Sequence, residues 1–442
     1  MRKGRTFKGG IHPPGNKELS SGKAIVDMGP PGEVVVPLQQ HIGAPCKPLV
    51  KKGDTVNKGQ KIGDTDAFVS APIHAPVSGV VKAVESRVHP AGCKIQAIVI
   101  ENDGEERLDP SITPAGDLDS LDAAAIKNIV REAGIVGLGG AAFPTHVKLN
   151  PPPDKKIHTL IMNGCECEPY LTCDHRLMVE QPEKIVYGTR ALLRALGISK
   201  AFVGIEENKP DAIAAMEKAV AQYPNIEVVP LKIKYPQGAE KQLITAITGQ
   251  EVSVGCLPMD TGVVVNNVGT AVAVATAIQT GMPLIERVVT VSGEGVREPQ
   301  NLLVRLGTRF SDVLEAAHGF SGTPKKVIMG GPMTGMTQFD LSVPVVKGTS
   351  GILVFNRLKT ATKPEACIRC GRCVDACPVF LLPVSIVQYA DGGQLSAAVE
   401  WGLLNCIECG SCSYVCPANR FLVQSIKLAK EEVRAERSKK TS

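Results

Sequence analysis

The central part of the chain alternates short apolar runs with longer segments in which apolar residues recur every three or four positions. The short runs predict β-strands at 158–162, 201–206, 226–231 and 263–268. The longer segments predict helices at 121–133, 184–196, 210–222 and 271–280, the first with Asp119 or Ser120 as its N-cap. Strands that alternate with helices in this way predict a doubly wound α/β sheet.

The flanking regions show different patterns. Glycine-punctuated short strands are expected in the first hundred residues, at 34–37, 47–50, 61–64, 79–84 and 96–100. Residues 288–355 predict further short strands around one helix at 309–318. Residues 383–405 predict two helices interrupted at Asp391, Gly392 and Gly393. Beyond residue 426, mixed Lys, Arg and Glu favour a solvated helix that frays at its end.

Composition narrows the class of protein. Of the 442 residues, 43% are hydrophobic and 21% are charged, which is typical of a globular chain and excludes a disordered one. No apolar stretch approaches the roughly 20 residues of a membrane span, and residues 1–10 do not resemble a signal peptide. We therefore expect a soluble, cytoplasmic protein. A net charge of +5 and 4% aromatic residues give no reason to expect a nucleic-acid partner.

Eight of the fourteen cysteines fall in two runs with the spacing C-x2-C-x2-C-x3-C-P, which is typical of bacterial ferredoxins. Structural zinc sites are the alternative, but they need only four ligands in two pairs. In the ferredoxin pattern the fourth cysteine of each run ligates the other cluster. The runs therefore predict two [4Fe–4S] clusters and electron transfer. The expected ligand sets are Cys367, Cys370, Cys373 and Cys416 for one cluster, and Cys406, Cys409, Cys412 and Cys377 for the other.

Polar and glycine-rich segments adjoin the predicted central strands. Residues 134–148 are rich in glycine and end in Lys148, a combination that suits an anion cradle, although a flexible turn would look the same. Asn163, Glu166 and Glu168 follow one strand, and Asn266 and Asn267 end another. Because open α/β sheets bind ligands at the carboxyl ends of their strands, these side chains are candidates for a binding site.

Taken together, these motifs resemble the FMN- and NADH-binding subunit of respiratory NADH dehydrogenases. With the cysteine runs and the opening motif at residues 8–14, nearly the whole chain resembles the RnfC family, the NADH-oxidising subunits of Rnf ion-translocating ferredoxin:NAD oxidoreductases. The resemblance implies non-covalent FMN, NAD(H) and two [4Fe–4S] clusters as cofactors. FMN links such partners because it exchanges two electrons with NADH and single electrons with a cluster.

The resemblance also implies roles for individual residues. Glu240 matches one member of a glutamate pair whose other position is Ala239 here, and an acidic residue of the asparagine motif is replaced by Gly269. Cys165 and Cys167 are expected to be ordinary pocket residues. Lys148, Glu166 and Glu168 are the implied catalytic residues. The implied cofactor-binding residues are Gly137, Gly139, Gly140, Lys148, Asn163, Glu166, Glu168, Glu240, Asn266 and Asn267.

Four modules are expected from these patterns and resemblances. Residues 1–115 resemble a biotinyl/lipoyl-type barrel-sandwich domain, with Phe68 near the hairpin tip where carrier domains have a lysine. This module is therefore expected to dock or to support other parts rather than to carry a group. Residues 116–285 form the Rossmann-like FMN/NADH domain, residues 286–356 an SLBB β-grasp domain that acts as a spacer, and residues 357–442 an α-helical double [4Fe–4S] ferredoxin-like domain with a basic tail.

The function that the resemblance implies is reversible electron transfer between NADH, FMN and two clusters. The expected partners are the other subunits of the Rnf complex, including a ferredoxin-like iron–sulfur subunit. The membrane subunits would couple electron flow to ion translocation and hold the chain at the cytoplasmic face of the inner membrane. Two alternatives are a cobalamin reductase-type flavin/iron–sulfur enzyme, in which the hammerhead-like segment lies near the C-terminus, and a non-catalytic iron–sulfur docking scaffold.

Overall fold

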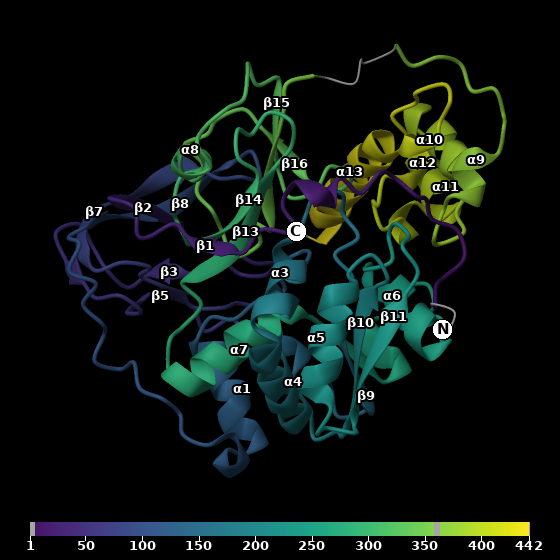
Figure 1. Cartoon of the computed structure of the whole chain (residues 1–442). Helices are drawn as coiled ribbons and strands as arrows, with labels where there is room; N and C mark the ends of the chain where they lie inside the picture. The colour runs from purple at the N-terminus through teal and green to yellow at the C-terminus, as the bar shows by residue number, and fades with distance from the viewer. Residues whose placement is uncertain (1–4, 358–362, 442) are drawn as a thin grey trace.

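The computed structural model describes residues 5–357 and 363–441, without the side chains of residues 440 and 441. Figure 1 shows two β-rich modules, in purple and green, packed side by side above an α/β module in blue and teal, whose helix α7 is drawn in green. A helical module in yellow-green and yellow contains both cysteine runs and lies beside the others. The last residue of the predicted C-terminal tail, Ser442, lies outside the described residues.

The α/β module contains a parallel four-stranded sheet in the order β11-β10-β9-β12. Because β10 and β11 lie on one side of β9 and β12 lies on the other, the strand order reverses between β9 and β12. The doubly wound prediction is confirmed, and this reversal marks the usual ligand crevice. The strands are β9 (Thr159–Gly164), β10 (Lys200–Glu206), β11 (Ile226–Leu231) and β12 (Val263–Asn267).

The helices of this module cover the sheet unevenly. Alternate residues of β9 point to opposite faces, with Leu160 and Met162 in the main core and Ile161 in a smaller core against α6. The main core lies beneath α4 and α7, which cross at Gly188. The helices are α1 (Ala123–Glu132), α2 (Thr145–Lys148), α3 (Cys173–Glu180), α4 (Pro182–Leu196), α5 (Pro210–Val220), α6 (Glu240–Thr248) and α7 (Val268–Thr280).

Two predicted helix starts in this module are wrong by about one turn. The N-cap of α1 is Asp122, whose carboxylate accepts a bond from the Ala125 amide at 2.7 Å. Asp117 instead caps a short 3₁₀ turn at Leu118–Ser120. Helix α7 begins at Val268 because the Asn267 side chain caps it directly after the strand. Side-chain caps therefore override the apolar pattern at both positions.

The N-terminal β module consists of two small sheets, ordered β2-β8-β7-β4 and β3-β5-β6. Val34, Ile62, Ile98 and other apolar residues fill the space between them, as in a flattened sandwich. The strands are β2 (Glu33–Pro37), β3 (Lys47–Pro48), β4 (Thr55–Val56), β5 (Lys61–Asp64), β6 (Ile73–His74), β7 (Gly79–Val88) and β8 (Lys94–Asn102). The tip residue Phe68 contacts His146 of α2, both ring to ring and through its carbonyl oxygen at 3.0 Å.

The module that follows the α/β module, drawn in green in Figure 1 and called the green module, comprises residues 286–355. It has a six-stranded mixed sheet in the order β1-β14-β13-β17-β15-β16. Its edge strand β1 (Ile25–Asp27) comes from the N-terminus and pairs in parallel with β14. The remaining elements are β13 (Glu286–Ser292), β14 (Gln300–Arg305), α8 (Phe310–Ala316), β15 (Lys326–Met329), β16 (Met336–Gln338) and β17 (Gly351–Phe355). The sheet therefore joins a strand near the N-terminus to strands that lie far along the chain.

The cysteine-run module is helical. The predicted pair is confirmed as α10 (Pro383–Asp391) and α11 (Leu395–Glu400), separated by the two glycines. The other helices are α9 (Arg372–Asp375), α12 (Ser411–Tyr414) and α13 (Leu422–Thr441), which continues further along the tail than expected. Among the described residues, no helix combines the length and apolar character that crossing a bilayer requires.

Candidate functional site

The glycine-rich loop lies at the crevice between β9 and β12. A β-carbon on Gly139 would lie 2.8 Å from the side-chain nitrogen of Asn267, so glycine lets the loop approach this side chain without displacing it. Gly140 has a left-handed φ of +102° and open space around it. The loop is closed by a bond from the Gly137 amide to the Phe143 carbonyl at 2.9 Å. The predicted glycines therefore bring backbone to the end of the sheet.

The two asparagines at the end of β12 have different surroundings. Asn267 accepts a bond from the Gly269 amide at 2.8 Å and donates one to Asp174 at 2.7 Å. Asn266 is 3% exposed, and neither polar atom of its side chain has a partner within the described residues. A buried amide without partners is costly unless a ligand supplies them. This orphaned amide fits a polar cofactor in the crevice.

Lys148 lies in the same region but is already paired. Its ammonium group donates to the Glu240 carboxylate at 2.9 Å and to the Val265 carbonyl at 3.0 Å. Asn163 donates to the Gly238 carbonyl at 2.8 Å, which brings the segment before α6 to the end of β9. The structure thus brings together Lys148, Asn163 and Glu240, which are far apart in the sequence.

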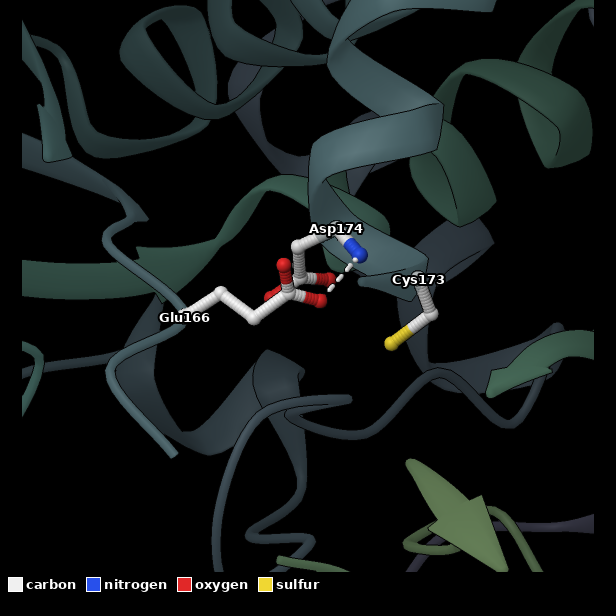
Figure 2. A group of neighbouring side chains, drawn as sticks. All are labelled: Glu166, Cys173 and Asp174. Atoms are coloured by element: carbon white, nitrogen blue, oxygen red, sulfur yellow. Dashed lines mark hydrogen bonds between the residues drawn. The ribbon is translucent and has the colours of Figure 1, made fainter. Parts of the chain in front are cut away.

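Glu166 anchors the start of α3 (Figure 2). The N-cap residue of this helix, Thr172, makes no side-chain cap, and the Glu166 carboxylate accepts from the Asp174 amide at 2.7 Å instead. Burial first, and then the nearby Glu166 charge, raise the pKa of Asp174 to about 7. Asp174 thereby connects Glu166 to Asn267. Sequence reasoning missed it, because only its place at a helix start distinguishes it from other acidic residues.

The Glu168 carboxylate makes its hydrogen bonds outside this group, and its catalytic role stays a prediction. Its carboxylate accepts bonds from the amides of Met333 and Thr334 at 3.0 and 2.9 Å. Burial raises the pKa of this carboxyl, and the three donors of the loop oppose that effect. These donors come from the green module with its six-stranded sheet, so Glu168 joins that module to the α/β module.

Cys165 and Cys167 lie beside the crevice, and Cys167 also packs against the apolar cluster that contains Tyr235 and Cys409. The Cys165 side chain is fully buried next to the Gly204 carbonyl. The Cys167 sulfur accepts a bond from the Gly238 amide at 3.4 Å, and burial is the main cause that raises the pKa of this thiol to about 12. These contacts are those of neutral pocket residues.

The first predicted ligand set lines one cavity of about 160 Å³. Apolar residues, including Ile368, Val384 and Leu422, complete its wall. The two runs repeat the same backbone shape, with left-handed φ at Arg369 and Gly371 and at the matching Glu408 and Gly410. The cavity brings together Cys367, Cys370, Cys373 and Cys416 from the two runs, a donor set that fits a cubane cluster.

The cysteines of the second set also lie close to one another. Burial first, and then the nearby Cys406, Cys409 and Cys377 thiols, raise the pKa of Cys412 to about 12. Cys377 therefore lies among cysteines of the other run, as the crossed pattern requires. Four thiols in one group, three of them buried, have no evident role without a metal that displaces their protons.

The two sets differ in exposure and in neighbours. Cys367 and Cys370 are exposed, whereas Cys377, Cys409 and Cys412 are buried. Cys409 packs with Tyr235 of the α/β module, whose hydroxyl donates to the Cys409 carbonyl at 2.8 Å. The set that includes Cys409 thus lies against the α/β module, and the other set lies at the surface.

Four family models match successive parts of the chain. They are the RnfC barrel sandwich hybrid domain at residues 5–105, the Nuo51 FMN-binding domain at 130–276, the SLBB domain at 288–337 and the 4Fe-4S dicluster domain at 359–417. The matches follow the order of modules that the sequence predicts.

The chain is also similar to solved structures of an NAD⁺-reducing [NiFe]-hydrogenase. In the air-oxidised state the match has a TM-score of 0.51 at 23% identity and covers 72% of this chain and 67% of that one. In the H2-reduced state the TM-score is 0.50 at 24% identity, covering 75% and 69%. At such identities the likeness shows a shared fold.

Curated relatives match along nearly the entire length. The chain is 52% identical to the C subunit of the Na⁺-translocating ferredoxin:NAD⁺ oxidoreductase complex of Acetobacterium woodii, over 98% of both chains. It is 50% identical to the proton-translocating counterpart of Clostridium ljungdahlii, over 98% of this chain and 94% of that one. The C subunit of a Rhodobacter capsulatus ion-translocating oxidoreductase complex is 47% identical over 98% and 84%. The chain therefore belongs to the RnfC family of Rnf-type ion-translocating ferredoxin:NAD oxidoreductase complexes.

Proposed function

We propose that this chain catalyses reversible electron transfer between NADH and a ferredoxin-type partner subunit, with FMN and two [4Fe–4S] clusters as its cofactors. FMN, when bound, exchanges a hydride with NADH and single electrons with the clusters. The observation that carries the proposal is the position of the buried cysteine set. It lies against the module that contains the crevice, with Tyr235 in contact with Cys409.

Different crevice residues would bind different parts of the flavin and the nicotinamide. Gly137, Gly139, Gly140 and Lys148 supply the backbone approach and positive charge that suit the FMN phosphate. For Lys148 to do so, its bond to Glu240 would have to yield or be shared. Asn266 supplies a donor and an acceptor for a flavin ring or ribityl chain. Asn163, Glu166, Glu240 and Asn267 complete the wall.

The two cysteine sets would have different tasks. The buried set, Cys377, Cys406, Cys409 and Cys412, would exchange electrons with the crevice. The exposed set, Cys367, Cys370, Cys373 and Cys416, would exchange them with the partner. This order is argued from burial, because three cysteines of the set proposed to face the crevice are buried and two of the set proposed to face the partner are exposed. Membrane subunits of the complex would hold the chain at the cytoplasmic face of the inner membrane and couple the reaction to ion translocation.

Anaerobic reconstitution of the full chain tests this function. We expect one flavin, iron and sulfide for two clusters, and bleaching of both chromophores when NADH is added. Protein that takes up iron but no flavin, and that does not respond to NADH, would contradict the proposal and favour a docking scaffold.

Lys148→Ala tests the crevice itself. Because the variant lacks the only side-chain cation named in the phosphate cradle, we expect flavin affinity to fall by roughly tenfold to a hundredfold, the range of one charge-assisted bond of about 1.5–3 kcal/mol. Iron content should remain unchanged. Lys218→Ala, on the exposed side of α5, is the matched control. Flavin titration with parallel iron analysis measures both effects, and loss of iron alone would refute the placement of Lys148.

A further inference from the structure

The first residues of the chain form a strap that is not part of the sandwich following it. We call residues 5–17 the N-terminal strap. At its start, Arg5 lies along the edge of the parallel sheet, where the Lys232 amide donates to the Arg5 carbonyl at 3.0 Å. Its side chain donates to the Ile247 carbonyl of α6 at 2.7 Å. Figure 1 shows this purple segment running from there along the helical module.

The middle of the strap lies between two modules. On one side, the Gly10 amide donates to the Ala376 carbonyl at 3.0 Å. On the other side, Ile11 and Tyr235 exchange two backbone bonds at 2.8 and 2.9 Å. Ala376 directly precedes the ligand Cys377, and Tyr235 contacts Cys409. The strap thus contacts the backbone beside Cys377 directly and reaches Cys409 through Tyr235.

Gly9 and Gly10 of the strap are held tightly. Gly9 has φ +76°, and a β-carbon there would lie 2.7 Å from the Cys377 carbonyl oxygen. Gly10 has φ +79°, and its β-carbon would lie 2.6 Å from the Tyr235 carbonyl oxygen. Both neighbours are backbone atoms, which cannot give way as a flexible side chain can. Any larger residue would push the cysteine-run module and the α/β module apart.

The end of the strap is anchored on the loop that contains Glu166. The ammonium group of the half-buried Lys17 donates to the carbonyls of Glu166, Glu168 and Leu171 at 2.8, 2.9 and 2.6 Å. The Tyr170 amide donates to the Gly15 carbonyl at 2.7 Å. One continuous segment therefore connects the crevice loop to the backbone beside Cys377.

We propose that the N-terminal strap sets the separation between the crevice and the buried cysteine set, with Gly9 and Gly10 as positioning residues. The proposal rests on the proposed function, since separation matters only if electrons pass between the two. The opening motif at residues 8–14 then serves electron transfer, although it lies ahead of the sandwich in the chain. Its glycines are required for close contact and not for flexibility.

Gly9→Ala in the full, reconstituted chain tests the strap. We expect full flavin and NADH-dependent reduction of an artificial acceptor at the crevice, because the crevice residues are untouched. Bleaching of the clusters by NADH should slow by roughly tenfold to a hundredfold, the order expected of ångström-scale misplacement. Amide hydrogen exchange should become faster at residues 7–14 and 374–378. Gly22→Ala, which meets nothing within 4 Å, is the matched control and should change neither quantity.

Several outcomes would overturn the inference. Faster exchange with wild-type bleaching would show that the strap does not set the separation, and unchanged exchange would show that the contact is not tight. If Gly9→Ala fails to load iron, amide hydrogen exchange of the wild-type protein is the test. Exchange of the Gly10 and Ile11 amides as fast as that of Gly22 would refute the proposed tight contact of the strap. Slower exchange of these two amides would support it. Failure of the proposed function is distinguishable, because the wild-type chain would then not reduce the artificial acceptor.

Discussion

Asp174 illustrates how the surroundings of a single carboxyl determine its protonation. It is enclosed between Glu166 and Asn267 at the start of α3, and its pKa of about 7 lies well above the usual value near 3.9. Lys209 and Arg287 lie near enough to lower this pKa, but burial and Glu166 outweigh them. The fold therefore keeps Asp174 protonated at pH values at which an exposed aspartate is ionised.

This raised pKa predicts a pH dependence of stability. Between about pH 4 and pH 7 the folded chain binds more protons at Asp174 than the unfolded chain, so this contribution to the free energy of unfolding falls as pH rises. In Asp174→Asn that contribution is absent. We therefore expect a smaller drop in melting temperature between pH 5 and pH 8 than in the wild type.

Scanning calorimetry at the two pH values measures the difference. Asp66→Asn is the control, because Asp66 is exposed at the sandwich tip and should leave the drop unchanged. A drop in Asp174→Asn as large as in the wild type would refute the assigned protonation.

Among the helices, the crossing of α4 and α7 depends on a single glycine. A β-carbon on Gly188 would lie 2.0 Å from the Ala271 carbonyl oxygen. This oxygen belongs to α7, whose first turn is capped by Asn267 at the crevice. The close approach of the two helices therefore helps to place a site residue.

Gly188→Ala sets two effects against each other. Alanine favours a helix over glycine by about 1 kcal/mol, whereas overpacking costs about 1–3 kcal/mol and more when the obstacle is backbone. The overlap is severe, so we expect a net loss of about 1–2 kcal/mol in the free energy of unfolding. Urea denaturation measures this loss. Gly32→Ala, with open space around it, is the control. A stabilised Gly188→Ala protein would show that α7 can move aside.

Sequence patterns predicted the elements well where an element has a regular apolar face. The strands of the parallel sheet and the interrupted pair α10 and α11 were found to within a few residues. Helix starts were less predictable, because Asp117, Asp119, Ser120 and Asp122 are all acceptable caps and only the packing selects one. The pairing of β1 with β14 could not be predicted, since three residues carry no periodicity and their partner lies far along the chain.

The same contrast holds for the site. Cysteine spacing specifies a metal site locally, so both sets could be grouped from sequence, and the crossed neighbours agree with that grouping. The roles of Glu168 and Asp174 depend on the tertiary fold. One meets a loop of another module and the other meets Asn267, and neither contact leaves a trace in the neighbouring sequence.

At the scale of the whole molecule, Lys347 joins three modules. It is fully buried, and its ammonium group donates to the carbonyls of Pro72 in the sandwich and Gly134 in the α/β module, both at 2.7 Å. Burial lowers the pKa of this lysine to about 8. A buried cation is costly, but here it satisfies two carbonyls that would otherwise lack a partner.

Lys347→Met removes the cation and leaves both carbonyls unpaired. Removing the buried charge stabilises the fold, whereas losing the two hydrogen bonds destabilises it. We expect the lost hydrogen bonds to outweigh the removed charge, so the free energy of unfolding should fall by about 1–3 kcal/mol. Denaturation at neutral pH tests this, with Lys325→Met as the exposed control. The wild type should also gain stability as pH rises from about 8 to 10.5, because the unfolded chain then binds the extra proton. Lys347→Met should lack that gain.

The N-terminal strap has a consequence for biosynthesis. Its residues are synthesised long before their partners Ala376 and Cys377, which lie far along the chain. At a translation rate of about 5–20 residues per second, tens of seconds pass between the synthesis of the strap and that of its partners. During that time Phe7 and Ile11, both buried in the finished protein, have no complete site to occupy. The strap is thus open to aggregation until the cysteine-run module has been synthesised, and that module completes the burial of Ile11.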